Sequence, residues 1–116
     1  MSILGNLDTI LVFVNDMDQS VAFYTQVLGF ECGYSSEHWS VINAPGARIG
    51  LHSGRESHHE SSVALCFQTA STEQLKAHLA ESQTKFSPEE HETPRGRLIE
   101  FYDPSGNRLQ AIELTS

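Results

Sequence analysis

Basic residues and cysteines are scarce in this sequence. Its 116 residues include seven lysines and arginines against 15 aspartates and glutamates, which gives a formal net charge of -8. Because phosphate binding needs clustered Lys and Arg, this balance argues against a nucleic-acid partner. The two cysteines, Cys32 and Cys66, lack CxxC spacing. They are too few for a disulfide framework and favour a reducing compartment.

Long hydrophobic runs are also missing. No apolar run approaches the roughly 18 residues needed to cross a membrane. The opening MSILGNLDT has no basic segment followed by an apolar core. We therefore expect a cytoplasmic protein with no membrane partner. A hydrophobic share of 39% and a charged share of 19% predict a folded globular protein. Its length suits a single domain over residues 1–116.

The first half of the chain predicts one strand, one helix and then three strands. In LDTILVFVND the residues alternate between two faces that are both mostly apolar, which predicts a strand that is covered on one side and lines a cavity on the other. The next segment is helical, with Asp16 or Asp18 as its N-cap and Gly29 as a C-cap glycine. Three short strands follow, around ECGYSS, HWSVIN and ARIGLH.

The same order of elements is predicted to start again after a polar connector over residues 54–61. SVALCFQT reads as a strand, and STEQLKAHLAES as a helix with Ser71 and Gln74 placed as a capping box. Further strands lie between Phe86 and Leu114, separated by proline-containing turns. His91 is assigned to a loop and His78 to the helix surface.

This duplication predicts an α+β fold of two βαβββ modules, module one over about 6–53 and module two over about 61–114. Neither module is long enough to bury a sufficient core alone, so we expect the two to pair within a chain or to swap between chains. We predict a curved sheet around a concave cleft with the helices on its outer face. Such a concavity is where a small molecule would bind.

Two motifs carry a resemblance to a known family. NDMDQSVAFYTQVLGFE, residues 15–31, and FYDPSGNRLQAIE, residues 101–113, lie near the two ends of the chain. They resemble the entry motif and the closing DPxGN turn and strand of the vicinal oxygen chelate superfamily, which includes glyoxalase I, bleomycin-resistance proteins and extradiol dioxygenases. The resemblance spans Leu7 to Leu114 and implies the paired-module fold.

The resemblance also implies where a metal would be held. Metal-dependent members place His, Glu or Gln at one inward position on each of four strands. In this sequence those positions fall on Thr9, Gly50, about Ser62 and Gln110. Glycine has no side-chain donor, threonine and serine hydroxyls are weak ligands, and only Gln110 offers a neutral oxygen donor. We therefore expect no metal cofactor.

Strand alternation predicts an apolar and aromatic pocket with a few polar groups. Trp39 lies on a strand whose facing the sequence does not fix, and His52 is the one histidine of six expected near the cavity. The alternative is that the aromatic residues fill the core, the arginines reach solvent and Cys66 is an inert buried thiol. The predicted ligand-binding residues are Phe13, Trp39, Arg48, His52, Arg108 and Gln110.

Two functions follow from these observations. The first is a metal-independent binder of a drug or metabolite that acts as a homodimer, as the bleomycin-resistance branch does. The alternative is an enzyme, a glyoxalase-like lyase or a dioxygenase, with an altered metal site around His52 and Gln110. No catalytic residue is assigned. The acidic net charge favours a cationic ligand, whereas Arg48 and Arg108 suit an anionic one.

Overall fold

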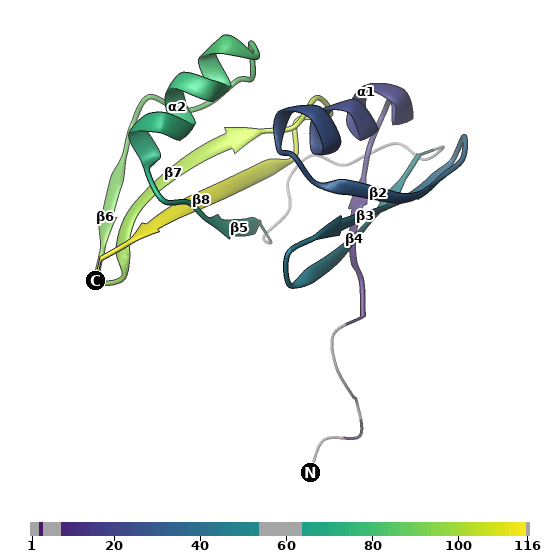
Figure 1. Cartoon of the computed structure of the whole chain (residues 1–116), viewed down its shortest axis with the longest axis horizontal. Helices are drawn as coiled ribbons and strands as arrows, with labels where there is room; N and C mark the ends of the chain where they lie inside the picture. The colour runs from purple at the N-terminus through teal and green to yellow at the C-terminus, as the bar shows by residue number, and fades with distance from the viewer. Residues whose placement is uncertain (1–2, 4–7, 54–63, 116) are drawn as a thin grey trace. The chain divides into compact units, whose positions relative to one another are not determined.

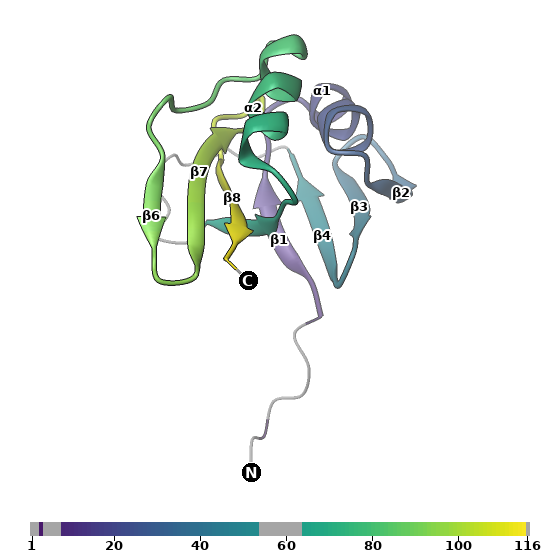
Figure 2. The same ribbon diagram turned by 60° about the vertical axis from the view of Figure 1, so that its left-hand side comes forward.

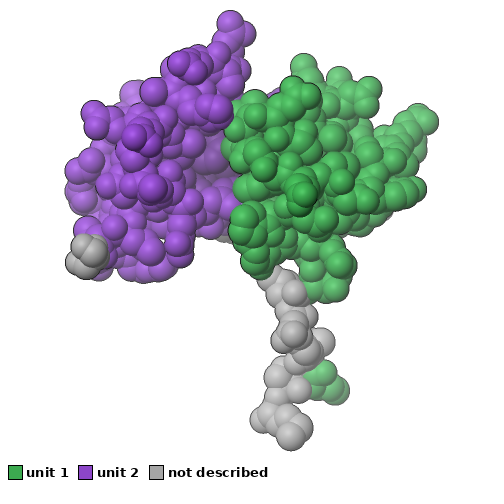
Figure 3. All heavy atoms as spheres, in the orientation of Figure 1, with its two compact units in different colours: residues 1–57 green, residues 58–116 purple. Residues whose placement is uncertain are grey.

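The protein forms two compact units, Met1–Ser57 and His58–Ser116 (Figure 3). The structure is a computed structural model that describes Ile3 and residues 8–53 and 64–115. Each unit contains a four-stranded sheet and one helical segment, and both follow the order βαβββ (Figure 1). The predicted α+β class and the repeated order of elements are therefore confirmed.

Unit 1 has a mixed sheet whose strands lie in the order β1-β4-β3-β2. The first and last strands of the unit, β1 and β4, are parallel neighbours, and the other pairs are antiparallel. The ladder between β2 and β3 shifts register between Cys32 and Tyr34. The elements are β1 Ile10–Phe13, α1 Met17–Ala22, η1 Phe23–Val27, β2 Glu31–Ser35, β3 Trp39–Ala44 and β4 Ala47–His52.

The helical segment of unit 1 begins at the predicted N-cap. The carboxylate of Asp16 accepts a hydrogen bond from the amide of Gln19 at 3.0 Å. From Phe23 the segment continues as a π-helix, in which the amide of Leu28 donates to the carbonyl of Phe23. The sequence pattern predicts an ordinary helix here. The chain leaves the helix at Gly29, whose φ of +82° is the conformation that glycine adopts at helix ends.

One face of the unit 1 sheet is the core. The side chains of Val12, Ile42, Ile49 and Leu51 alternate with outward residues along their strands and are at most 9% exposed. On this face α1 packs against β3 and β4, and the hydroxyl of Ser40 donates to the sulfur of Met17. The residues that alternate with these four along the strands therefore lie on the other face of the sheet.

Unit 2 repeats the plan with strand order β5-β8-β7-β6, and its first and last strands are again parallel neighbours (Figure 2). The structure corrects the prediction for His91, which begins the edge strand β6 and is not in a loop. The elements of unit 2 are β5 Leu65–Gln68, α2 Thr72–Glu81, β6 His91–Thr93, β7 Gly96–Tyr102 and β8 Arg108–Leu114.

The core of unit 2 lies between α2 and its sheet. The α2 helix packs against β7 and β8, and Leu79 is fully buried. Ile99 and Phe101 of β7 face the same side as Leu109 and Ala111 of β8, because they are register partners across the ladder. The hydroxyl of Ser71 accepts the amide of Gln74, which is one half of the predicted capping box. The amide of Ser71 donates to the hydroxyl of Thr69 at 3.4 Å, where the capping box would have the Gln74 side chain. The opposite face of the sheet carries Gln110.

The DPSGN turn between β7 and β8 is organised around one buried carboxylate. Asp103 is 4% exposed. One of its oxygens accepts the amides of Ser105 at 3.0 Å and Asn107 at 2.8 Å, and the other accepts the side-chain amide of Asn107 at 2.9 Å. Gly106 supplies the positive φ of +87°. The turn therefore holds β7 and β8 in their register.

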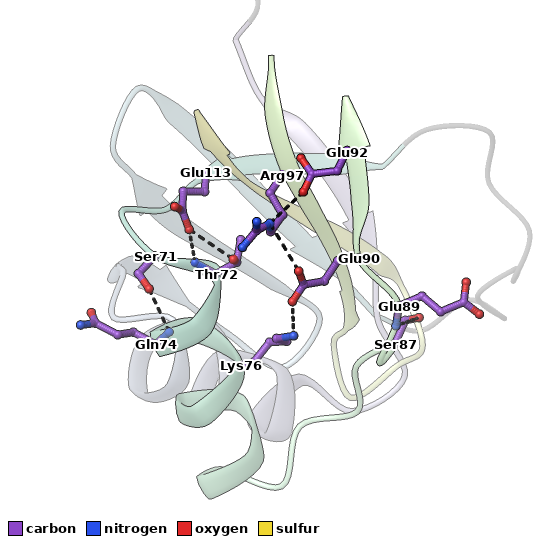
Figure 4. A network of polar contacts seen from close by, with 10 residues as sticks. All are labelled: Ser71, Thr72, Gln74, Lys76, Ser87, Glu89, Glu90, Glu92, Arg97 and Glu113. Atoms are coloured by element: carbon purple, nitrogen blue, oxygen red, sulfur yellow. Dashed lines mark hydrogen bonds and ion pairs between the residues drawn. The ribbon is translucent and has the colours of Figure 1, made fainter. Parts of the chain in front are cut away.

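A polar network fastens α2 to the sheet of unit 2 (Figure 4). Glu113 accepts the amide of Thr72 at 2.7 Å, so a carboxylate from β8 helps to cap the start of α2. Lys76 of α2 donates to Glu90, which also lies 3.4 Å from the guanidinium of Arg97. The hydrogen bond from Lys76 is the main reason that the pKa of Glu90 lies below its ordinary value of 4.5.

The substitution Lys76→Met should lower Tm slightly at pH 7, and this difference should disappear in acid. A carboxylate with a depressed folded pKa contributes stability above its unfolded pKa and loses it as pH falls through the folded value. We therefore expect the wild type and the variant to converge as pH falls from about 5 to about 3. Thermal unfolding followed by circular dichroism at several pH values measures this.

Lys85→Met is the matched control. The ammonium of Lys85 lies 5.2 Å from the centroid of the Tyr102 ring and so interacts with a group that does not titrate in acid. Its effect on Tm should persist at low pH. A Lys76→Met difference of the same size at pH 3 and pH 7 would contradict the role assigned to Glu90.

Candidate functional site

Three rings lie side by side on the face of the unit 1 sheet opposite α1. Phe13 of β1 and Trp39 of β3 are both register partners of His52 on β4. The ring centroid of His52 lies 5.8 Å from that of Phe13 and 6.2 Å from that of Trp39, and both contacts are edge-to-face. We call these three residues the aromatic row. The structure thus fixes the facing of Trp39, which the sequence left open.

Gly50 provides the space that Trp39 occupies. A Cβ atom at position 50 would lie 2.5 Å from Cη2 of Trp39 and 3.1 Å from Cγ2 of Thr9. Those distances are too short for a side chain, so the indole packs directly over the backbone of β4. The position where the resemblance would put a metal ligand is therefore filled by the indole and the threonine methyl.

The other polar groups predicted on this face have different surroundings. Arg48 is exposed and its guanidinium lies 3.6 Å from the carboxylate of Asp8. That same aspartate accepts the hydroxyl of Thr9 at 2.7 Å. The Nδ1 atom of His52 is buried and has no hydrogen-bond partner among the described residues. An unpaired polar atom of this kind destabilises the fold by about 1–3 kcal/mol.

In unit 2 the face opposite α2 carries a polar cluster. The amide of Gln110 donates to the carboxylate of Glu100 at 3.2 Å, and the guanidinium of Arg108 lies 3.6 Å from the same carboxylate. Glu100 is not among the residues predicted from the sequence. Its signal lies in RLIEFY, where strand alternation puts Glu100 on the face of Gln110 once the β7–β8 register is known.

Cys66 adjoins this cluster because it is the register partner of Gln110. It is exposed, so the alternative of a buried thiol is wrong. Partial desolvation raises the pKa of the Cys66 thiol more than the positive charge of Arg95 lowers it. A thiol of raised pKa stays protonated near neutral pH and is a poor nucleophile.

The structure thus groups Phe13, Trp39 and His52 in unit 1, and Arg108 and Gln110 in unit 2. Arg48 lies apart from the aromatic row, paired with Asp8. Ser62 lies outside the described residues, as do the connector histidines at positions 58 and 59.

Metal ligation can be tested against the groups present. Across residues 8–53 and 64–115, no group of three or more His, Cys, Asp or Glu side chains is placed to hold a metal ion. Of the predicted ligand positions, Thr9 donates its hydroxyl to Asp8, Gly50 has no donor, and the Gln110 amide donates to Glu100. These residues do not fit a metal centre of the usual kind.

A separate hollow of about 320 Å³ lies in unit 2. Arg97, one of its lining residues, forms a hydrogen bond to Glu92 at 3.1 Å, and Glu113 caps α2. Each of these charged groups already has a partner within unit 2, so the hollow belongs to the network that holds α2. Its lining residues are Glu92, Arg97, Glu113, Leu114 and Thr115.

Comparison with protein families gives one match over most of the chain. The family model described as Glyoxalase/Bleomycin resistance protein/Dioxygenase superfamily matches residues 6–111. No curated protein sequence matches the chain significantly. None of the described helices is long and apolar enough to span a membrane.

Several solved structures are similar to this one. FosX, the fosfomycin resistance protein of Listeria monocytogenes, has a TM-score of 0.85 at 21% identity, covering 97% of this chain and 94% of its own. A FosX mutant was solved with Mn(II) and 1S,2S-dihydroxypropylphosphonic acid. Lactoylglutathione lyase of Agrobacterium tumefaciens has a TM-score of 0.74 at 16% identity, covering 96% and 95%. An integron cassette protein from the metagenome of Halifax Harbour sewage outfall has a TM-score of 0.77 at 24% identity, covering 96% and 100%.

Proposed function

Because the chain belongs to the Glyoxalase/Bleomycin resistance protein/Dioxygenase superfamily, we propose that it is a metal-independent binder of a small molecule, a drug or a metabolite, that acts as a homodimer in the cytoplasm. Its proposed ligand contacts are the residues predicted from strand alternation, with Glu100 added. They are Phe13, Trp39, Arg48 and His52 in unit 1, and Glu100, Arg108 and Gln110 in unit 2.

The packing of Trp39 over Gly50 is the observation that carries this proposal. A metal ligand at position 50 would need a side chain where the indole already lies within 2.5 Å of the Cβ position. Recovering a donor there requires both a substitution of the glycine and a movement of Trp39. The indole of Trp39 occupies this space instead, and its aromatic surface supports binding by stacking.

The chemistry of the remaining positions supports the same proposal. The hydroxyl of Thr9 is a weak ligand and is already bonded to Asp8. Gln110 directs its amide nitrogen, which cannot ligate a cation, at Glu100. Affinity in such a protein comes from ring stacking, displaced water and a few hydrogen bonds, offset by the entropy lost on binding.

The second candidate function is a metal-dependent lyase or dioxygenase with an altered site. The buried and unpartnered Nδ1 of His52 favours it, because a neutral imidazole nitrogen is a common metal ligand. FosX, which is similar in fold, binds Mn(II). Gln110 offers the only other donor that the resemblance would supply, and a neutral amide is a weak one.

Metal content and thermal shift discriminate between the two functions. For a metal-independent binder we expect no stoichiometric metal in the purified protein. Tm should not change when Ni²⁺, Zn²⁺, Mn²⁺ or Fe²⁺ is added or when a chelator follows. A metal that binds the folded state with a free concentration a hundredfold above its Kd would add about 2.7 kcal/mol, a shift that is easily detected.

Two results would overturn the proposed function. One is a rise in Tm with a single metal that a chelator reverses and that His52→Ala abolishes, since this would place the metal on His52. The matched control is His78→Ala, an exposed histidine on α2. The other is a monomer in light scattering at micromolar concentration, which would contradict the proposed dimer.

A further inference from the structure

The aromatic row is a preformed surface. Its three side chains come from three neighbouring strands, β1, β4 and β3, whose hydrogen-bonded ladders hold them in register. Trp39 is fixed from below by the backbone of Gly50, and Phe13 at the sheet edge is 36% exposed. Because the rings meet edge-to-face, a flat ligand ring would stack on the face of one of them and contact the edge of its neighbour, with little loss of side-chain entropy.

The charges of unit 1 disfavour an anion on this surface. Among residues 8–53, Arg48 is the only lysine or arginine, and Asp8 lies 3.6 Å from it. The same residues include the carboxylates of Asp8, Asp16, Asp18, Glu31 and Glu37. The described part of unit 1 therefore carries an excess of negative charge, although Asp16 and Asp18 belong to the α1 segment on the other face of the sheet. The face of an indole itself attracts cations. Both arginines that would suit an anion lie 3.6 Å from a carboxylate, Arg48 from Asp8 and Arg108 from Glu100, which reduces their attraction for an anionic ligand.

His52 offers the ligand a hydrogen-bonding group. Its ring stands edge-to-face between Phe13 and Trp39, and its buried Nδ1 has no partner among the described residues. Buried polar atoms of a protein are nearly always paired, and an exception calls for a reason. Because Nδ1 is buried, a ligand can bond it only if a neighbouring ring moves, and Phe13, which is 36% exposed at the sheet edge, is the ring with room to do so. Such a ligand would supply the missing partner.

We propose that the ligand of unit 1 is a planar aromatic molecule, uncharged or positively charged, that stacks on the aromatic row and forms a hydrogen bond with His52. This inference rests on the proposed function and names its ligand class. It separates this protein from FosX, whose bound 1S,2S-dihydroxypropylphosphonic acid is a non-aromatic anion. Phosphonates should bind poorly here.

Three two-ring probes of similar size and different charge, together with one small anion, test the ligand class. N-methylquinolinium is cationic, quinoline is neutral at pH 7.5, 2-naphthoate is anionic, and methylphosphonate represents a small anion. Trp39 is the one tryptophan of the chain, so its indole N–H gives a single, assigned signal in the ¹⁵N spectrum of the whole protein. We expect saturable shifts with the first two probes and at least about tenfold weaker binding of 2-naphthoate.

Two variants test the named contacts by calorimetry. Trp39→Leu should weaken N-methylquinolinium and quinoline together, by about tenfold. His52→Phe keeps a ring and removes the nitrogen, so quinoline should weaken by about tenfold while N-methylquinolinium, which has no free ring nitrogen, is unchanged. His78→Phe is the control for an added ring and should leave both affinities unchanged.

The experiments distinguish a wrong ligand class from a wrong proposed function. Tighter binding of 2-naphthoate or methylphosphonate than of the two quinolines would overturn the ligand class but leave a metal-independent binder in place. Equal loss of both quinolines in His52→Phe would remove the hydrogen bond from the inference. Binding of any probe only after a divalent metal is added would overturn the proposed function itself.

Discussion

Replacing Asp103 with alanine is expected to lower the free energy of unfolding by about 3 kcal/mol, which corresponds to a fall in Tm of roughly 10 °C. The carboxylate is 4% exposed and accepts three hydrogen bonds within the DPSGN turn. Alanine would leave the amides of Ser105 and Asn107 without their acceptor. Hydrogen bonds to charged groups contribute about 1.5–3 kcal/mol each, and their sum is reduced here because the turn can admit water. Urea unfolding measures the loss.

Two further variants make this prediction specific. Asp103→Asn keeps the shape and one carbonyl acceptor, so it should cost less than half as much as Asp103→Ala. Glu89→Ala removes an equal charge from an exposed position in the same unit and should change stability by less than about 0.5 kcal/mol. If Asp103→Ala behaved like Glu89→Ala, the carboxylate would not be what holds the turn.

Gly50→Ala is expected to lower the free energy of unfolding by about 2 kcal/mol and to displace the indole of Trp39. The added Cβ would lie 2.5 Å from Cη2 and 3.1 Å from Cζ3 of the ring. The strand cannot move because β4 is paired on both sides, so the indole must tilt away from the sheet. The Trp39 indole N–H signal should move, and N-methylquinolinium should bind about tenfold more weakly.

A double-mutant cycle supplies the control. In a Trp39→Leu background the two crowding ring atoms are absent, so Gly50→Ala should cost much less than it does in the wild type. The difference between the two costs measures the coupling between positions 50 and 39. Equal costs in both backgrounds would mean that the alanine is excluded for another reason, such as contact with Thr9.

The features that could be predicted from the sequence are local ones. Asp16 and Ser71 cap helices because each side chain bonds an amide three residues ahead, a contact visible in the chain order. Likewise, the period of two within a strand puts Phe13 on one face and Val12 on the other. The family motifs depend on the same local geometry, and they led to the correct fold.

The features that were missed depend on pairing between strands. Trp39 is aligned with His52 only through the β3–β4 register, and Glu100 meets Gln110 only through the β7–β8 register. His91 begins a strand of three residues that is polar and lies at a sheet edge, so no hydrophobic alternation marks it. The exposure of Cys66 likewise depends on what packs over β5, which its own sequence does not encode.

The first and last strands of each unit pair in parallel, and this pairing sets the order in which the ladders of its sheet can form. In unit 2, β8 lies between β5 and β7, so the last strand of the unit in chain order is an inner strand of the sheet. The β7–β8 hairpin joins neighbours in the chain, whereas the β5–β8 ladder must close a loop through the whole unit. On the ribosome, β5 has no ladder partner until β8 emerges. The backbone edge of β5 that pairs with β8 therefore stays unpaired while α2, β6 and β7 are made.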